Sequence, residues 1–350
     1  FHSSLYHSTM NSLENLYSAS YCDDPSLCEG CTILGKSKPV HSVLDYKDID
    51  EAPVLFLSDS LKYQYGSHSA FSSAEISKVI EPATKFIPEG SIAYAAAVKC
   101  PDVREADMSP SNMVICRQHL SDTIDKIKPR VVFACGNLAM KMLVKKSGIT
   151  TKRGKSFEYK SLSGHECVVV PIYHPYSLIK EPSHKELFQM DIRNAYAMYI
   201  EGKRSDKKFS HHLIMEFSEL DGYDYLRNTD QTIAVDIETT GLNFLQDSIT
   251  TIAISCGEDN IVIPIDHKDT PFIEGDRFAV FKWLSYVAQN PNNKKVFHNS
   301  KFDQKFLLKH GIKFINVWDT KIMSHLLNEN MPKGLMDLVK AYFPMELESL

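Results

Sequence analysis

The sequence predicts a chain of two α/β domains, and three observations support this prediction. Over residues 1–200, short apolar runs alternate with helical patterns, which is typical of a parallel sheet covered on both faces by helices. Over residues 213–350, three strand patterns come first and helical patterns follow, which predicts an α/β domain with a mixed sheet. Residues 201–212 are polar and basic and lack apolar periodicity, so we expect a linker there.

In the first domain, the runs "APVLFLSD", "SIAYAAAVK", "RVVFACG" and "CVVVPIYH" have the length and composition of buried parallel strands. Helical spacing of apolar residues lies between and after them. The predicted strands cover 52–59, 91–99, 130–136 and 167–174, and the predicted helices cover 72–83, 111–127, 137–146 and 186–200. This βαβ order predicts a three-layer α/β/α domain.

In the second domain, "QTIAVDIETT", "SITTIAISCG" and "NIVIPID" are separated by short turns, which predicts an antiparallel meander. Four helical patterns follow, at 277–289, 301–311, 320–330 and 334–343. We see no internal repeat and no low-complexity tract.

Bulk composition excludes some classes of protein and favours none strongly. The net charge is −5, so any nucleic acid would have to be met by local basic patches. No apolar run approaches 18 residues, so we expect no membrane span. Eight cysteines in 350 residues are too few for a disulfide scaffold, which favours a reducing, cytoplasmic setting with thiols or metal ligands.

Two acids lie one residue apart in "AVDIETTGL", at the end of an apolar strand. Alternation along a strand places Asp236 and Glu238 on the same face. A solvated sheet edge would explain such a pair, but buried acids are costly unless something pairs with them. Further along, "VFHNSKFDQKFLLKHGI" places Asn299 and Asp303 four residues apart, which predicts one face of a helix.

Together Asp236, Glu238 and Asp303 are hard oxygen ligands of the kind that suit Mg²⁺ or Mn²⁺. Two such ions about 3.5–4 Å apart can stabilise both the attacking and the leaving oxygen in phosphodiester cleavage. In "WDTKIMSHLLNEN", Asp319 or Thr320 is predicted to cap the next helix.

The segments "DIETTGL", "HNSKFD", "DTKIMSHLL" and "GLMDLVKAYF" occur in an order that resembles the 3′–5′ proofreading exonuclease domain of family A DNA polymerases, of the DEDD type. The resemblance covers about residues 215–350 and implies an RNase H-like mixed sheet. It implies that Asp236, Glu238 and Asp303 are metal ligands and catalytic residues. It also implies that Thr239 and Leu242 contact the 3′-terminal nucleotide of single-stranded DNA, that Asn299 lies near the substrate, and that Asp319 is structural.

The family's third motif, a Tyr or His followed by an Asp, lies beyond the "GLxDL" helix. Tyr342 and Glu346 are four residues apart but flank Pro344 and come too early to be that motif. We therefore expect the chain, as given, to lack one metal ligand and to be an incomplete exonuclease domain. By the same resemblance, a polymerase core would follow residue 350.

Four cysteines near the start of the chain have the spacing of a metal site. Cys28 and Cys31 form a C-x2-C pair, and Cys100 and Cys116 follow. Four thiolates suit either Zn²⁺ or an iron–sulfur cluster, although four unrelated buried thiols would give the same count. Cys22 lacks the two-residue spacing and is not assigned.

The surroundings of these cysteines, "AAAVKC", "KPRVVFACGNLAMKMLV", "GITTKRGKSFEY" and "VVVPIYHPYSLIKEPSHKELFQMDI", look like a family 4 uracil-DNA glycosylase over about residues 22–200. That resemblance implies a structural [4Fe–4S] cluster on Cys28, Cys31, Cys100 and Cys116, in preference to zinc.

The same resemblance assigns glycosylase positions. Asp59 lies where the family's water-positioning acid lies, Phe71 matches the aromatic that stacks on uracil, and His174 matches the histidine that stabilises the leaving base. However, "FLSDSLKYQYG" lacks the glycines and proline of the family motif, and Ala96 replaces the asparagine that reads uracil. Alanine cannot make a bidentate base contact, so we expect a glycosylase fold that serves as a DNA-binding or assembly module.

Six basic residues follow the third predicted strand: Lys145, Lys146, Lys152, Arg153, Lys155 and Lys160. They could form a solvated face or could meet DNA phosphates.

Three hypotheses follow for function. The first is the N-terminal part of a phage-type DNA polymerase, acting in the host cytoplasm, with metal-dependent 3′–5′ exonuclease activity. The second is a non-catalytic DNA-binding or assembly module. The third is a repair glycosylase that removes uracil or another modified base.

Overall fold

The structure is a computed structural model of the 350-residue chain. It describes residues 20–21, 28–33, 40–41, 52–64, 67–203, 210–329 and 331–343. The chain divides into two compact units, which are considered separately. The first unit comprises residues 1–205 and 339–350, and the second comprises residues 206–338.

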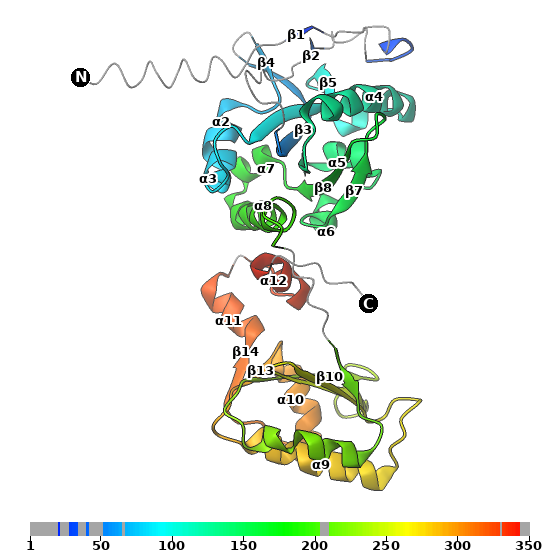
Figure 1. Cartoon of the computed structure of the whole chain (residues 1–350), viewed down its shortest axis with the longest axis vertical. Helices are drawn as coiled ribbons and strands as arrows, with labels where there is room; N and C mark the ends of the chain where they lie inside the picture. Colours follow the sequence, from blue (N-terminus) through cyan, green and yellow to red (C-terminus); the bar gives the residue numbers. More distant parts are fainter. Residues whose placement is uncertain are drawn as a thin grey trace, which may run out of the picture. The chain divides into compact units, whose positions relative to one another are not determined.

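The first unit is built on a sheet whose centre is parallel, as expected. Strands β5, β3, β6 and β8 are parallel neighbours, and β7 adds an antiparallel edge next to β8 (Figure 1). The strands are β1 Ser20–Tyr21, β2 Val40–His41, β3 Val54–Gln64, β4 Ser67–Ser69, β5 Ile92–Pro101, β6 Val131–Cys135, β7 Phe157–Lys160 and β8 Glu166–Ile172. The separate β1–β2 pair is antiparallel.

Helices cover both faces of this sheet, because the central strands carry apolar side chains on each side. One core contains Leu55, Leu57 and Val132 with residues of α4 and α5, and the other contains Phe56, Phe133 and Val170 with residues of α8. The α-helices are α2 Ser73–Glu75, α3 Glu81–Thr84, α4 Pro110–Ile127, α5 Asn137–Val144, α6 Ile149–Lys152, α7 Pro175–Lys180 and α8 Lys185–Tyr199. A π-turn spans Ile76–Ile80, and 3₁₀ turns span Glu105–Asp107 and Pro182–His184.

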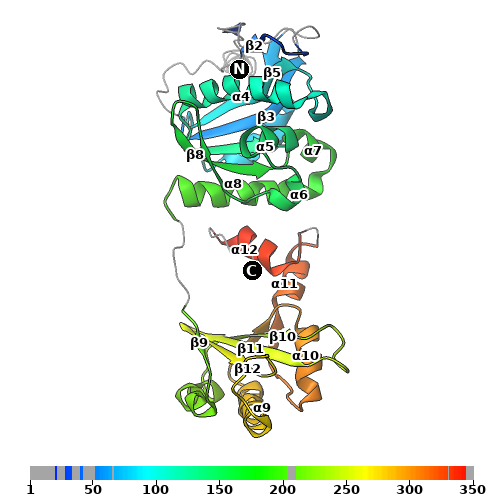
Figure 2. The ribbon, with the colours of Figure 1, turned by 90° about the vertical axis from the view of Figure 1, so that its right-hand side faces the viewer.

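The second unit has the expected mixed sheet. Strands β10, β11 and β12 form the antiparallel meander, and β13 and β14 continue the sheet parallel to β10 (Figure 2). The order is β14-β13-β10-β11-β12-β9. The strands are β9 His212–Leu213, β10 Ile233–Thr239, β11 Ile249–Cys256, β12 Asp259–Pro264, β13 Lys295–Phe297 and β14 Val317–Asp319. The helices are a 3₁₀ helix Phe217–Arg227, α9 Glu274–Gln289, α10 Ser300–Lys309 and α11 Thr320–Leu327; α12 Leu335–Tyr342 contains residues assigned to both units.

One face of the second sheet packs against α9 and α10. Ile233, Val235 and Ile237 of β10 point into that core with Trp283 of α9 and Phe306 of α10. The residues between them therefore face the other side of the sheet. In the described ranges, no helix is both long and apolar enough to cross a membrane.

Candidate functional site

The two acids of β10 lie on the sheet face opposite to the core. Along this strand Ile233, Val235 and Ile237 are buried, whereas Asp236 and Glu238 are exposed. The alternation of the sequence thus places both carboxylates on one side, as predicted. Partial burial raises the pKa of Asp236, and the neighbouring charge of Glu238 raises it further.

The third acid reaches the same strand from α10. Asp303 lies in the first turn of that helix, is only 3% exposed, and accepts a hydrogen bond from the Ile237 backbone N–H at 3.3 Å. Burial raises the pKa of Asp303 to about 7, and the charges of Asp236 and Asp319 contribute. The backbone group that donates to Asp303 therefore belongs to Ile237, the residue between Asp236 and Glu238 on β10.

This arrangement concentrates negative charge near the end of β10. Within the described ranges, no group of three or more His, Cys, Asp or Glu side chains stands ready to hold a metal ion. The donor chemistry of the three carboxylates nevertheless fits Mg²⁺ or Mn²⁺, because Glu238 raises the pKa of Asp236, Asp236 raises the pKa of Asp303, and a hard cation would relieve that repulsion.

Asn299 does not lie on the helix that carries Asp303, so the expectation of a shared helical face was wrong. Asn299 precedes α10 and adopts a left-handed backbone conformation with φ 73° and ψ 45°. Asparagine tolerates this conformation better than most residues. Its side-chain oxygen lies 3.5 Å from Lys321 Nζ. Its role near a substrate stays a prediction.

Asp319 joins the starts of two helices. It is the N-cap of α11 and accepts hydrogen bonds from the backbone N–H groups of Lys321 and Ile322. It also accepts from the backbone N–H groups of Asn299 and Ser300, at the start of α10. Burial alone would raise the pKa of Asp319, but these donors lower it. The predicted helix cap is confirmed, and the same carboxylate also holds the helix that bears Asp303.

Thr239 and Leu242 lie just after Glu238. The Thr239 hydroxyl donates to the Gly241 carbonyl at 2.7 Å, and Leu242 is 87% exposed. Asp247 organises this loop by accepting from the Asn243 backbone N–H at 2.8 Å. A Cβ on Gly241 would lie 2.6 Å from an Asp247 oxygen, so any other residue here would displace that carboxylate. The loop therefore presents Leu242 to solvent on an ordered backbone.

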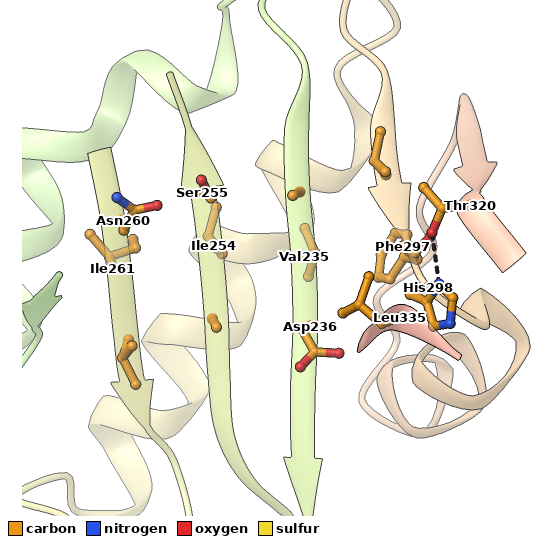
Figure 3. A pocket seen from close by; sticks show the side chains of 14 residues that line it. Val235, Asp236, Ile254, Ser255, Asn260, Ile261, Phe297, His298, Thr320 and Leu335 are labelled. Carbon is orange, nitrogen blue, oxygen red and sulfur yellow. Dashed lines mark hydrogen bonds between the residues drawn. The ribbon is translucent and has the colours of Figure 1, made fainter. Parts of the chain in front are cut away.

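A cavity of about 300 Å³ adjoins Asp236 on the same face of the sheet. Its walls come mainly from β10, β11, β12 and β13, and His298, Thr320 and Leu335 complete them (Figure 3). His298 Nδ1 lies 2.9 Å from the Thr320 hydroxyl, which donates to the Phe297 carbonyl. His298 also lowers the pKa of Asp236 electrostatically. A mostly apolar cavity beside carboxylates can accept an aromatic base.

In the first unit, Asp59 lies within a strand that runs further than expected. The sequence predicted that this strand ends at Asp59, but β3 continues to Gln64 and pairs with β4. Asp59 accepts a hydrogen bond from the Ala139 backbone N–H at 2.8 Å, at the start of α5, and burial raises its pKa to about 6. A Cβ on Gly136 would lie 2.8 Å from the Asp59 carboxylate, which explains why a residue without a side chain occupies this position.

Phe71 and His174 lie together, as the resemblance implies. Their ring centroids are 5.9 Å apart, and Phe71 is only 1% exposed. Glu75 lies 3.4 Å from His174 Nδ1 and accepts from Lys62 Nζ at 2.7 Å. Burial lowers the pKa of His174 to about 4, so the ring is neutral near pH 7. Ala96 is fully buried in β5, so it offers no polar group to a base.

The four predicted cysteine ligands come from three separate segments. Cys28, Cys100 and Cys116 are buried, and Cys31 is half-buried. Burial raises the pKa of Cys116 to about 12, and the charges of Cys100, Cys31 and Cys28 raise it further. Cys22 lies outside the described residues. Among the described residues these cysteines do not form a ready group of three or more metal ligands, but thiolates are ligands for either metal type that the sequence left open.

One face of α4 holds the Cys28–Cys31 turn in place. Asn112 donates to the Thr32 hydroxyl at 2.9 Å and accepts from the Thr32 backbone N–H at 3.3 Å. His119 Nε2 lies 3.2 Å from Cys28 Sγ. Asn112, Cys116 and His119 are spaced four and three residues apart, so they lie on the same helix face.

The basic residues after β6 do not act as one set. Arg153 is directed inward and forms an ion pair with Asp191 at 2.7 Å. Lys160 pairs with Glu166 on the surface, and the Lys146 ammonium lies 4.7 Å from the centre of the Phe157 ring. Arg153 is therefore not available to DNA phosphates, which corrects the grouping expected from the sequence.

Comparison with known families agrees with this division of the chain. The uracil-DNA glycosylase superfamily matches residues 48–196, and a 3′–5′ exonuclease family matches residues 212–349. The chain joins a domain of the uracil-DNA glycosylase superfamily to a 3′–5′ exonuclease domain.

Two relatives show the same two resemblances. A DNA polymerase of Bacillus phage SP01 is 22% identical over 270 residues, which are 69% of this chain and 28% of the polymerase. A type-4 uracil-DNA glycosylase of Sulfurisphaera tokodaii is 29% identical over 112 residues, which are 31% of this chain and 50% of that protein. This chain thus corresponds to less than two thirds of either relative.

Solved nucleases are similar to part of this chain. Brucella melitensis NrnC is 27% identical and has a TM-score of 0.29, covering 37% of this chain and 59% of NrnC. Escherichia coli RNase D, an exoribonuclease, is 18% identical and has a TM-score of 0.33, covering 40% of this chain and 35% of RNase D.

Sequence reasoning missed three residues that shape these domains. In the exonuclease domain, these are His298, which directly precedes Asn299, and Asp247, which lies at the end of the loop that it organises. In the glycosylase-superfamily domain, Asn112 is buried in a helix and gave no periodic signal. A polar residue at a buried helical position was the available signal for Asn112.

Proposed function

We propose that the exonuclease domain removes nucleotides from the 3′ end of single-stranded DNA in a metal-dependent reaction. The observation that supports this proposal is that Asp236 and Glu238 share the open face of β10, and that the buried Asp303 of α10 accepts a hydrogen bond from the Ile237 backbone N–H between them. Asp236, Glu238 and Asp303 would hold Mg²⁺ or Mn²⁺. When bound, such ions activate the attacking water and stabilise the leaving oxygen.

The neighbouring residues would position the substrate. The exposed Leu242 would contact the terminal nucleotide, with Thr239 beneath it, and the cavity beside Asp236 and His298 would accept an apolar part of the substrate. Asn299 lies at the start of α10, where its side chain can reach the substrate or stay with Lys321. A fourth acid is expected in a third motif beyond residue 350.

The decisive test is digestion of 3′-labelled single-stranded DNA by the full-length protein with Mg²⁺ or Mn²⁺. Replacing both Asp236 and Glu238 by alanine should abolish digestion, because two metal ligands are lost. A matched control replaces Asp221 and Glu274, two exposed acids of the same domain, by alanine, and should digest normally. Undiminished digestion by the variant that lacks Asp236 and Glu238 would contradict their assignment as metal ligands.

The glycosylase-superfamily domain is proposed to carry a [4Fe–4S] cluster on Cys28, Cys31, Cys100 and Cys116, with a structural role. The cluster would join the Cys28–Cys31 turn to β5 and α4. Anaerobically purified protein should then absorb near 400 nm and contain about four irons per chain, in the range of thiolate-bound clusters. A colourless protein with one zinc per chain would support the same four ligands but would exclude an iron–sulfur cluster.

In the whole protein, these domains are proposed to precede a polymerase core that follows residue 350, with the domain boundary in residues 201–212. The similarity to a phage polymerase supports a phage origin and action in the host cytoplasm. The glycosylase-superfamily domain would serve as a DNA-binding or assembly module, because Ala96 offers no base contact and Phe71 is covered.

A base-excision function is the second candidate, since Phe71 and His174 remain in contact and the superfamily matches. The test is release of uracil, or of a modified thymine, from an oligonucleotide. Release that disappears in His174→Ala would establish a glycosylase. Absence of release, together with salt-dependent DNA affinity, would leave the binding role.

A further inference from the structure

The loop that follows β10 carries a second exposed leucine, Leu245, in addition to Leu242. The two side chains are 71% and 87% exposed. The backbone around them is nevertheless ordered by hydrogen bonds. The Leu245 backbone N–H donates to the Asn243 side chain at 3.1 Å. The Thr240 backbone N–H donates to the Ser248 carbonyl at 3.0 Å, which closes the loop. The loop thus holds two apolar side chains in solvent on a fixed backbone.

Two lysines of α10 pack against this loop. Lys309 Nζ donates to the backbone carbonyls of Leu245 and Asp247, at 3.4 and 3.2 Å. The Lys305 ammonium lies 5.5 Å from the centre of the Phe244 ring, which is within the range of a cation–π contact. The two lysines are four residues apart, so they lie on one face of α10. The loop and this face of the helix therefore form one continuous surface.

The two ammonium groups leave positive charge on this surface. Lys305 and Lys309 are exposed, and in the described part of the chain neither forms an ion pair with a carboxylate. The Asp247 carboxylate accepts from the Asn243 backbone N–H within the loop. An ammonium group has three donors, so each lysine can meet a phosphate oxygen and keep its contact with the loop. Apolar side chains beside such charges suit single-stranded DNA, which offers base faces and phosphates in alternation.

The surface adjoins the acids of the proposed active site. Asp303 lies in the first turn of α10, and Lys305 and Lys309 follow on the same helix. Lys309 is six residues beyond Asp303, which is about 9 Å along the helix axis. On the loop, Leu245 follows Leu242 by three residues. A strand whose last nucleotide contacts Leu242 therefore has this surface beside its preceding nucleotides.

We propose that the loop of residues 240–248 and the adjoining face of α10 receive the part of the DNA strand that precedes its 3′-terminal nucleotide. Leu245 lies against a base, and Lys305 and Lys309 meet phosphates. The inference rests on the proposed exonuclease function and assigns a place to the rest of its substrate. It makes digestion depend on substrate length, because a dinucleotide is too short to reach the whole surface.

The experiment measures kcat/KM of the full-length protein with Mg²⁺ on 5′-labelled oligonucleotides of two and of eight nucleotides, over a series of salt concentrations. The variants are Leu245→Ala and the double variant Lys305→Met, Lys309→Met. The matched control, Lys282→Met with Lys294→Met, removes two exposed charges elsewhere in the domain. Lys294 directly precedes β13, whose start pairs with the start of β10, so it lies at the opposite end of the sheet from the loop.

Wild type should digest the octanucleotide more efficiently than the dinucleotide. Leu245→Ala should lower kcat/KM for the octanucleotide by about fivefold, the lower limit for a base stacked on a side chain, and should leave the dinucleotide value unchanged. In the double variant of Lys305 and Lys309, the salt dependence for the octanucleotide should also weaken. The slope of log(kcat/KM) against log[salt] should become shallower by about 0.7 for each lost phosphate contact. The control should match wild type in both respects.

Three results would overturn this inference and leave the exonuclease assignment standing. The first is equal efficiency of wild type on both lengths. The second is a loss of equal size on both lengths in the variants, which would mean that Leu245 and the two lysines only hold the loop that carries Leu242. The third is an equal change of salt slope in the control. No digestion by wild type at either length would overturn the proposed function and this inference together.

Discussion

Several acids have different neighbours in the two domains. In the glycosylase-superfamily domain, Asp191 pairs with Arg153, Glu75 pairs with Lys62, and Asp59 accepts from a helix N-terminus. In the exonuclease domain, the neighbours that act on Asp236 and Asp303 include other acids, which raise the pKa of both. Asp191 and Glu75 of the first domain thus have basic partners, whereas Asp236 and Asp303 of the second carry the charge that the proposed metal ions would offset.

The largest expected effect comes from Asp303→Asn. If the three acids serve a metal, digestion of DNA by the full-length protein should fall by about 10⁴-fold, close to 5–6 kcal/mol at 1.36 kcal/mol per tenfold. The metal-free protein should melt at a higher temperature, because a buried, repelled carboxylate is gone. Added Mn²⁺ should raise the melting temperature of wild type but not of the variant. If the metal-free variant instead melts at a lower temperature than metal-free wild type, Asp303 has a structural role.

Breaking the Arg153–Asp191 pair should have the next largest effect, on stability alone. Arg153→Ala leaves a buried carboxylate without its cation, which should reduce the free energy of unfolding by about 3–5 kcal/mol. Denaturant unfolding of the variant measures this loss. Lys160→Ala, which breaks an exposed pair, is the control and should unfold like wild type. Equal unfolding of Arg153→Ala and wild type would contradict the internal role of Arg153.

Replacing Asp319 should reduce the free energy of unfolding by a smaller amount, and this reduction should depend on pH. Asp319→Ala removes the cap of α11 and a support of α10, which should cost about 1–3 kcal/mol. The pKa of Asp319 is lowered in the folded state, so the carboxylate stabilises the domain above its unfolded pKa. That contribution is lost as the pH falls through the folded pKa. The stability gap between wild type and variant should therefore narrow in acid, and a gap that widens would contradict this assignment.

The smallest effect is expected from Gly241→Ala. The new methyl group would displace Asp247 and shift the loop that carries Leu242, with a stability change of no more than about 1 kcal/mol. We expect a KM for DNA that rises a few-fold and a kcat that changes little. The double variant Gly241→Ala, Asp247→Ala distinguishes two causes of a raised KM. If the only cause is the steric clash with Asp247, the double variant should restore KM. If the loop also needs the hydrogen bond to Asp247, KM should stay raised.

The sequence predicted the long elements well, and the reasons for the misses are physical. Apolar runs located the parallel strands and the β10–β12 meander because side-chain burial alone defines them. Strands β13 and β14 have three residues each, too short for a periodic pattern. The end of β3 was misplaced because Asp59 and its polar neighbours break the apolar run although the backbone continues to pair with β4.

The candidate sites were predictable in residue type and less so in geometry. The spacing of Asp236 and Glu238 fixes their common face, and a resemblance supplied Asp303. Asn299 was misplaced because four-residue spacing assumes a helix that had already begun, whereas its left-handed backbone precedes the helix. Arg153 was grouped with neighbouring lysines because charge in a sequence does not reveal that Asp191, on a distant helix, lies beside it.

The double cap by Asp319 has a consequence for interpreting other sequences. One carboxylate sets both where α10 starts and where α11 starts, and it contributes to folding whether or not a metal or DNA is bound. A descendant that loses catalysis is free to change Asp236, Glu238 and Asp303, yet it still needs Asp319 to keep its shape. Retention of this aspartate would therefore indicate an intact fold, and on the proposed function the three acids around β10 would distinguish a working nuclease from an inactive copy.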